Sequence, residues 1–216
     1  MRTALILSGC GYLDGAEIHE SVLCLLALAE RGHEFYCFAP DILQRKVMNH
    51  LSRKEMDESR NVLIEAARIA RGKIFSLSKL SSEDFDALLL PGGFGVASNL
   101  STFGEEKDRC SVDEECKGKI MDFYHAKKPI GALCISPAIL GKIFQNEKSI
   151  LLTLGKRKES NVYLENMGMH AIETEIFEVA TDKENKIFST PAYMEPGDPA
   201  KIFKGIKKLI LEMEKA

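Results

Sequence analysis

The stretch Lys128-Pro129-Ile130-Gly131-Ala132-Leu133-Cys134-Ile135-Ser136-Pro137-Ala138 joins an apolar strand, a cysteine and a helix start without a linker. Proline is favoured in the first turn of a helix, so Pro137 predicts a helix that begins directly after Cys134. This turn is typical of a nucleophile elbow, in which the helix N-terminus favours a thiolate and the N–H of Ile135 can stabilise an oxyanion. A buried, inert cysteine is the alternative that the stretch leaves open.

On both sides of this stretch, short apolar runs typical of strands alternate with segments whose apolar residues recur at helical spacing. The expected strands are Arg2–Ser8, Glu34–Phe38, Lys73–Leu77, Ala87–Leu90, Pro129–Leu133 and Ile150–Leu154, and the expected helices are Glu17–Arg31, Val62–Arg71, Val112–Ala126, a helix through about Phe144, and Ala200–Met213. Residues Asp41–Asn61 predict a polar surface excursion, and Ile176–Ala180 and Lys186–Ser189 predict a hairpin through Asp182–Asn185. The alternation predicts an α/β fold, with a mostly parallel sheet covered by helices on both faces, in one domain over residues 1–216.

Composition excludes several classes of function. The 216 residues carry a net charge of −3 and no basic stripe, which argues against nucleic acid as a partner. No apolar run approaches the ~20 residues of a membrane span, so no membrane partner is expected. The run Met1–Ser8 reads as a strand rather than a signal peptide, and a cytoplasmic location follows, where thiols stay reduced.

The six cysteines have wide, irregular spacings and no C-x-x-C pair. A disulfide framework and a metal site are therefore not expected. Cys24 and Cys37 fall in predicted core elements, and no role is assigned to Cys110 and Cys116.

The loop Gly9-Cys10-Gly11-Tyr12-Leu13-Asp14-Gly15 follows the first predicted strand. It resembles the dinucleotide fingerprint G-x-G-x-x-G, but Asp14 occupies the third glycine position, where an acid would repel a pyrophosphate. A tight strand-to-helix loop is the favoured interpretation, and Cys10 is a candidate for lining a pocket.

Three titratable residues, Glu17, His19 and Glu20, follow this loop in the first helical turn. Acids at that position often only cap the helix. They also lie at the carboxyl edge of a parallel sheet, where α/β folds bind ligands. Both a capping role and a functional role therefore stay open for Glu17 and Glu20, and a surface role stays open for His19.

The segment Pro91-Gly92-Gly93-Phe94-Gly95 follows the strand Ala87–Leu90. Its glycines allow backbone N–H groups to point toward a ligand. A plain tight turn is the alternative. Together with Cys134 and an acid from the first helix, this loop predicts a cysteine–acid–oxyanion site.

Several ordered motifs resemble the ElbB-type branch of the ThiJ/PfpI superfamily, described as isoprenoid-biosynthesis proteins with an amidotransferase-like domain. The motifs are Leu7-Ser8-Gly9-Cys10-Gly11, Asp14-Gly15-Ala16-Glu17-Ile18-His19-Glu20, Phe38-Ala39-Pro40-Asp41, Asn61-Val62-Leu63-Ile64-Glu65-Ala66-Ala67-Arg68, Pro91-Gly92-Gly93-Phe94-Gly95, Cys134-Ile135 and Thr190-Pro191-Ala192-Tyr193-Met194. They extend over nearly the whole chain.

The resemblance implies a flavodoxin-like three-layer sandwich of the class I glutamine amidotransferase type. It implies Cys134 as nucleophile, Glu20 as the acid hydrogen-bonded to the thiol, and the backbone of Gly93 and Ile135 as the oxyanion site. The implied activity is a cofactor-free glyoxalase or deglycase that acts on small aldehydes such as glyoxal, in a homodimer. Further pocket candidates are Cys10, Glu17, Gly92, Phe94 and Tyr193.

The chain departs from many relatives at Ile135, where they carry a histidine after the nucleophile. The histidine that follows Cys134 in the chain is His170, which lies in no matching motif and makes a Cys–His–Glu amidase doubtful. His19, beside Glu20, is the candidate proton carrier. Two alternatives stay open: a non-enzymatic redox sensor built on Cys134, and an amidase or amidotransferase subunit linked to isoprenoid biosynthesis.

Overall fold

The computed structural model describes residues 1–146 and 149–216. Its centre is a seven-stranded sheet of order β10-β11-β7-β6-β1-β2-β5. Every neighbouring pair is parallel except β10 with β11. The strands are β1 (Arg2–Ile6), β2 (Glu34–Ala39), β5 (Ile74–Ser76), β6 (Ala87–Leu90), β7 (Ile130–Leu133), β10 (Ala180–Asp182) and β11 (Ile187–Thr190).

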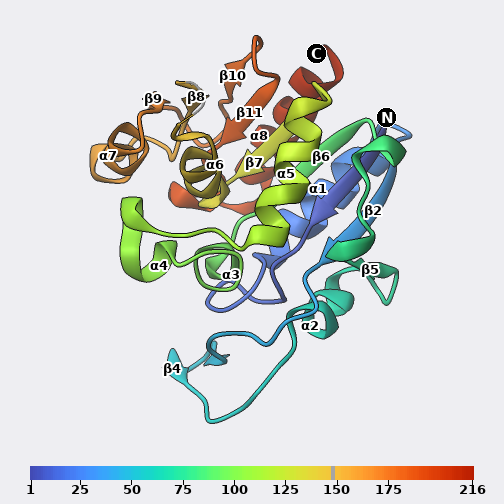
Figure 1. Ribbon diagram of the computed structural model, residues 1–216, viewed down its shortest axis with the longest axis vertical. Coiled ribbons are helices and arrows are strands. Elements are labelled where there is room, and N and C mark those ends of the chain that lie inside the picture. Colours follow the sequence, from blue (N-terminus) through green and yellow to red (C-terminus); the bar gives the residue numbers. More distant parts are fainter. Residues whose placement is uncertain (147–148) are drawn as a thin grey trace.

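Helices cover both faces of the sheet, so the predicted α/β architecture is confirmed (Figure 1). One face packs against α1 (Ile18–Glu30), α2 (Val62–Ile69) and α8 (Pro199–Glu214). The other packs against α3 (Phe94–Ser98), α4 (Phe103–Glu106), α5 (Glu114–His125), α6 (Ser136–Phe144) and α7 (Lys158–Asn166). In Figure 1, α5 lies in front of the sheet and α1 behind it.

Alternating side chains of the central strands divide the core into two layers. In β1, Ala4 and Ile6 join the layer under α5 and α6, whereas Leu5 joins the layer under α1 and α8. The same alternation places Leu88 and Leu89 of β6 in opposite layers. Successive strand residues point to opposite faces, and all of these side chains are buried, as expected of strands covered on both sides.

Several expected elements differ in the structure. The segment Ile150–Leu154 contains β8 (Leu151–Leu152), which pairs with β9 (His170–Ala171) in a separate small sheet. The excursion Asp41–Asn61 carries a small hairpin of β3 (Met48–Asn49) and β4 (Lys54–Glu55), at the bottom of Figure 1. The strand expected over Ile176–Ala180 is wrong except at its last residue, because β10 begins at Ala180.

The helices α3, α4 and α7 were not expected from the sequence. The first two have five and four residues, and such short elements carry little periodicity. In the described part of the chain, no helix is both long and apolar enough to span a membrane.

Candidate active site

Cys134 connects β7 to α6 with a backbone φ of 58°, in the left-handed region that non-glycine residues rarely adopt. The N–H of Cys134 donates to the carbonyl of Thr190 in β11 at 3.0 Å, which holds the turn against the sheet edge. The side chain is 8% exposed, at the carboxyl end of its strand. A strained residue at such a turn is typical of a nucleophile elbow, as the sequence predicted.

Glu20 lies under this elbow and is fully buried. Its Oε2 accepts a hydrogen bond from the N–H of Gly92 at 2.9 Å, and its Oε1 accepts one from the N–H of Tyr193 at 3.2 Å. One carboxyl from α1 therefore ties together the loops that follow β6 and β11. The oxygens of a buried carboxyl need such partners, and here each has one.

Gly92 is the point at which the thiol and the carboxyl meet. A Cβ built on Gly92 would lie 2.3 Å from Cys134 Cβ, 2.8 Å from Glu20 Oε2 and 2.9 Å from Cys134 Sγ. No side chain fits in that space without displacing one of the two groups. Glycine is therefore required here for close approach of the backbone.

The two loops around this point are joined backbone to backbone. The N–H of Glu17 donates to the carbonyl of Gly92 at 2.9 Å, and the N–H of Phe94 donates to the carbonyl of Tyr12 at 2.8 Å. Gly93 has a φ of 103°, and a Cβ on it would lie 2.3 Å from the carbonyl oxygen of Gly15. The glycine-rich loops that the sequence singled out thus pack on each other beside Cys134.

The thiol of Cys134 and the carboxyl of Glu20 shift each other's pKa. Burial raises the pKa of Glu20 to about 7, and the charge of Glu17 adds to the rise, whereas hydrogen bonds from Tyr193, Gly92 and the Cys134 thiol lower it. Burial, and then the charge of Glu20, raise the pKa of Cys134 well above its ordinary value. Two anions in this space would repel, so the pair keeps a proton at neutral pH.

The elbow supplies the expected donors, because the N–H groups of Gly93 and Ile135 hydrogen-bond the sulfur and lower the pKa of Cys134. Burial outweighs them, so the pKa of Cys134 is raised although a helix N-terminus alone favours a thiolate. The effect of Glu20 and Cys134 on each other's pKa agrees with the coupling that the sequence predicts for a thiol beside an acid.

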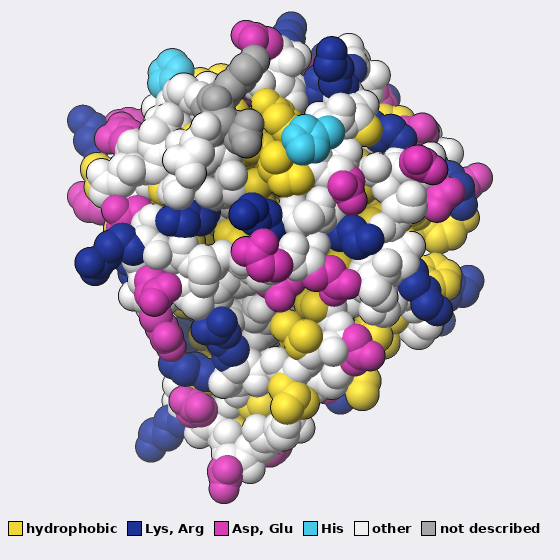
Figure 2. Space-filling model, in the orientation of Figure 1, with side chains coloured by type: hydrophobic (Ala, Val, Ile, Leu, Met, Phe, Trp, Pro, Cys, Tyr) yellow, Lys and Arg dark blue, Asp and Glu magenta, His cyan; other side chains and the backbone are white. Residues whose placement is uncertain are grey.

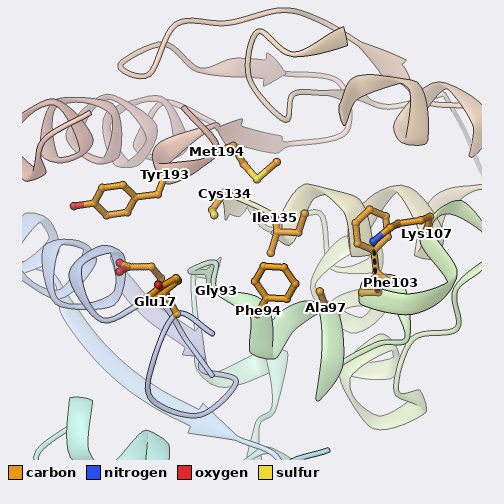
Figure 3. A pocket seen from close by; sticks show the side chains of 12 residues that line it. Glu17, Gly93, Phe94, Ala97, Phe103, Lys107, Cys134, Ile135, Tyr193 and Met194 are labelled. Carbon is orange, nitrogen blue, oxygen red and sulfur yellow. Dashed lines mark hydrogen bonds between the residues drawn. The ribbon is translucent and has the colours of Figure 1, made fainter. Parts of the chain in front are cut away.

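A cavity of about 270 Å³ opens over the thiol (Figure 3). It is lined by Tyr12, Glu17, Gly93, Phe94, Ala97, Phe103, Gly104, Lys107, Cys134, Ile135, Tyr193 and Met194. In Figure 3, Glu17 and Tyr193 lie on one side of Cys134, and Lys107 lies at the far end beyond Phe94. Most of the wall is apolar, with one acid and one lysine at opposite ends.

The structure brings most of the predicted site residues together, but not all. His19 does not line the cavity, and its Nδ1 lies 2.9 Å from the hydroxyl oxygen of Tyr193, which does line it. Cys10 and Gly92 do not line it either, so their predicted placement in the pocket wall is corrected. Gly92 instead packs against Cys134 and Glu20, and the half-buried thiol of Cys10 is influenced by the charges of Glu65 and Arg68.

Six lining residues were not among the predicted site residues: Tyr12, Ala97, Phe103, Gly104, Lys107 and Met194. Tyr12 and Met194 stand inside motifs that the sequence had singled out, so their loops were the available signal. Lys107 follows the unexpected helix α4 with a φ of 52°, and no motif marks it.

His170 lies in β9, exposed, and does not line the cavity. Within residues 1–146 and 149–216, no group of three or more His, Cys, Asp or Glu side chains is placed to hold a metal ion. All six cysteines are free.

No family model matches the chain. Curated relatives do match: the chain is 39% identical to the rat (Rattus norvegicus) "ES1 protein homolog, mitochondrial", over 97% of this chain and 81% of that protein. It is 40% identical to the human (Homo sapiens) "Glutamine amidotransferase-like class 1 domain-containing protein 3, mitochondrial", over 89% of this chain and 75% of that protein.

Solved structures agree. An "isoprenoid biosynthesis protein with amidotransferase-like domain" from Ehrlichia chaffeensis superposes with a TM-score of 0.93 at 37% identity, over 100% of this chain and 99% of that chain. Drosophila melanogaster DJ-1beta superposes with a TM-score of 0.59 at 16% identity, over 99% of this chain and 94% of that chain, which shows a shared fold.

The expected cytoplasmic location is wrong by this comparison, because the rat and human relatives are named as mitochondrial proteins. The expectation rested on interpreting Met1–Ser8 as a strand, which does not distinguish the cytoplasm from a mitochondrion.

The identity over most of both chains, the shared fold and the elbow cysteine over a buried glutamate lead to one conclusion. The chain belongs to the ES1 family of glutamine amidotransferase-like class 1 domain proteins, and it shares its fold with DJ-1beta.

Proposed function

We propose that the chain converts small reactive aldehydes to hydroxy acids, as in glyoxal to glycolate, with Cys134 as nucleophile and Glu20 as proton shuttle. One observation carries the proposal: the Cys134 thiol faces a cavity and contacts the fully buried carboxyl of Glu20, whose pKa is raised to about 7. A general acid–base group works best with a pKa near the working pH.

The reaction begins with addition of sulfur to one aldehyde carbon. The S–C bond forms as the carbonyl π pair moves to oxygen, and the thiol proton passes to the Glu20 carboxylate. In this proposal the N–H groups of Gly93 and Ile135, which hydrogen-bond the sulfur, stabilise the developing oxyanion. Glu20 then returns the proton to the oxyanion, which gives a hemithioacetal.

Glu20 next takes the proton from the carbon bonded to sulfur and returns it to the neighbouring carbon through an enediol, while the hydroxyl proton of the hemithioacetal passes to the oxygen of that neighbouring carbon. The first carbon is oxidised to a thioester while the second is reduced to an alcohol, so the electrons balance within the substrate. Water cleaves the thioester and restores the thiol. The sum is glyoxal plus water to glycolate plus one proton.

Tyr193 and His19 are the candidates for carrying protons between this site and solvent. The Tyr193 hydroxyl shares a hydrogen bond with His19 Nδ1 at 2.9 Å, and the Tyr193 side chain lines the cavity. His19 itself is exposed. In this proposal His19 acts through Tyr193 rather than on the substrate.

Two further points bear on the proposal. A solved "glyoxalase III" from Candida albicans shares the fold with a TM-score of 0.64, at 14% identity. The amidase alternative needs a histidine beside the nucleophile, and the cavity wall of the described chain contains none. The homodimer expectation stays a prediction.

The test follows glycolate formation from glyoxal by proton NMR, using the purified full chain and Glu20→Gln. The wild-type chain is expected to form glycolate, and the Glu20→Gln chain to lose about 10²-fold or more of the rate, the contribution of a general base. A wild-type chain that consumes no glyoxal, or a Glu20→Gln chain with full activity, overturns the proposal.

A further inference from the structure

A second cavity of about 250 Å³ adjoins the one over Cys134. The two share Phe94, Ala97 and Gly104 in their walls. The second cavity is further lined by Leu13, Arg45, Lys46, Met48, Ser98, Ser101, Thr102 and Glu105. The Phe94 side chain, 55% exposed, stands at the boundary between them.

The two adjoining cavities differ in the charge of the side chains that line them. Glu17 lines the end near Cys134, and Lys107 lines the far end of the same cavity (Figure 3). Arg45 and Lys46 line the second cavity, with Glu105 as its acid. A ligand that is neutral at one end and anionic at the other would be oriented by this difference, because an anion beside Glu17 would be repelled.

The backbone of Arg45 is held by a hydrogen bond, but among the residues that the structure describes its guanidinium is not paired with an acid. Its backbone N–H donates at 3.1 Å to Oδ1 of Asn99, whose amide group is buried and also donates to the carbonyls of Ser8 and Asp14. In the described part of the chain, the Arg45 guanidinium has neither a hydrogen-bonding nor an ionic partner. An ordered backbone that carries a free guanidinium is suited to bind a phosphate or carboxylate.

The neighbouring cations differ from Arg45 in this respect. Lys46 Nζ lies 3.4 Å from Glu105 Oε1, an exposed pair of small strength. Lys107 Nζ donates to the carbonyl of Gly104 at 2.7 Å and has no carboxylate partner among the described residues. Arg45 and Lys107 thus remain available to an anion, one from each cavity.

The face of the molecule shown in Figure 2 is not basic. In Figure 2, acidic and basic side chains are intermixed over the visible side of the molecule. The net charge of −3 also gives no general attraction for anions. Selection of an anion would therefore depend on the local residues of the two cavities.

We infer that the second cavity is a subsite for the anionic end of the substrate. Arg45 would bind a phosphate or carboxylate group there, assisted by Lys107, while the aldehyde end reaches Cys134. For the reacting end this inference rests on the proposed function. For the anionic end it makes a separate claim, which binding alone can test.

The experiment measures binding of three matched three-carbon probes to the full chain by calorimetry. Glycerol 3-phosphate carries a phosphate, glycerate carries a carboxylate, and glycerol carries no charge. At least one of the two anions is expected to bind, and glycerol is not. Whichever anion binds identifies the group that the subsite takes, and failure of both overturns the inference.

Arg45→Gln is expected to weaken binding of that anion about tenfold or more, as loss of a charge-assisted hydrogen bond does. Lys107→Gln should weaken it less. Lys54→Gln is the matched control, because Lys54 is exposed on β4 and lines neither cavity. Equal affinity in the Arg45→Gln chain overturns the inference. None of these measurements needs turnover, so a failed glyoxal assay would leave this result intact.

Discussion

The carboxyl of Glu20 accepts the N–H of Gly92 at 2.9 Å, beside the Cys134 thiol, which a Cβ on Gly92 would strike. This relationship places an acid, a nucleophile and a backbone donor around one α-carbon. Because Glu20 is fully buried, its position depends on this bond and on the N–H of Tyr193. The chemistry of the site depends on how closely these three residues can pack.

Gly92→Ala is expected to inactivate the site and to destabilise the fold by about 1–3 kcal/mol, as overpacking of a dense interior does. The added methyl would lie 2.3 Å from Cys134 Cβ. Glycolate formation and urea denaturation measure the two effects. Gly118→Ala is the control: that helical glycine has nothing within 4 Å of an added Cβ, so the substitution should stabilise α5 by roughly 0.5–1 kcal/mol. Retained activity in the Gly92→Ala chain would contradict the packing described.

Stability should depend on pH through Glu20. Its folded pKa of about 7 exceeds the ordinary value of 4.5, so the folded chain holds the proton more tightly than the unfolded chain. The protonated carboxyl of Glu20 therefore stabilises the folded chain fully below about pH 4.5, and this stabilisation is lost as the pH rises through 7. By linkage its size is about 3 kcal/mol.

Urea denaturation of the wild-type and Glu20→Gln chains between about pH 4.5 and 8 measures this effect. The difference between their free energies of unfolding should fall with rising pH over that window, because the amide of the Glu20→Gln chain cannot titrate. A difference that stays constant would mean that Glu20 is ionised throughout, contrary to its burial.

Tyr193→Phe should lower kcat for glyoxal, because it removes the hydroxyl that joins the cavity to His19. His19→Ala should lower kcat in the wild-type chain and have little further effect in the Tyr193→Phe chain. Groups that act through one another give such non-additive effects. Equal losses from His19→Ala in both backgrounds would show that His19 acts independently of Tyr193.

The redox-sensor alternative predicts oxidation of Cys134 with negligible turnover. The present account instead predicts that hydrogen peroxide abolishes glycolate formation in proportion to the fraction of Cys134 oxidised, since the sulfur is the nucleophile. Mass spectrometry of peroxide-treated chain, run beside the glyoxal assay, compares the two fractions. Full turnover after complete oxidation of Cys134 would exclude a catalytic role for its sulfur.

The sequence predicted the sheet and the elbow because both follow from local patterns. The apolar runs of β1, β6 and β7 end at residues whose types mark tight turns, and Pro137 marks the following helix. Glu20 was found from the resemblance rather than from spacing alone, since acids in a first helical turn are often only caps. Glu17 in fact caps α1, as its side chain accepts the N–H of Glu20.

Two properties of the site depended on tertiary packing and could not be predicted. The sequence favoured a thiolate at Cys134, but burial and Glu20 together reverse that preference. Cys10 shares a loop with Tyr12, yet Tyr12 lines the cavity and Cys10 does not. Which side of a loop a residue faces is fixed by contacts far away in the chain.

The most direct test of the central claim is the rate of glycolate formation in the Cys134→Ala chain, measured by NMR beside the wild-type chain. Cys10→Ala serves as the matched control, because Cys10 is a half-buried thiol outside the cavity. The account predicts that Cys134→Ala abolishes glycolate formation and that Cys10→Ala retains it. Undiminished glycolate formation by the Cys134→Ala chain would contradict the account.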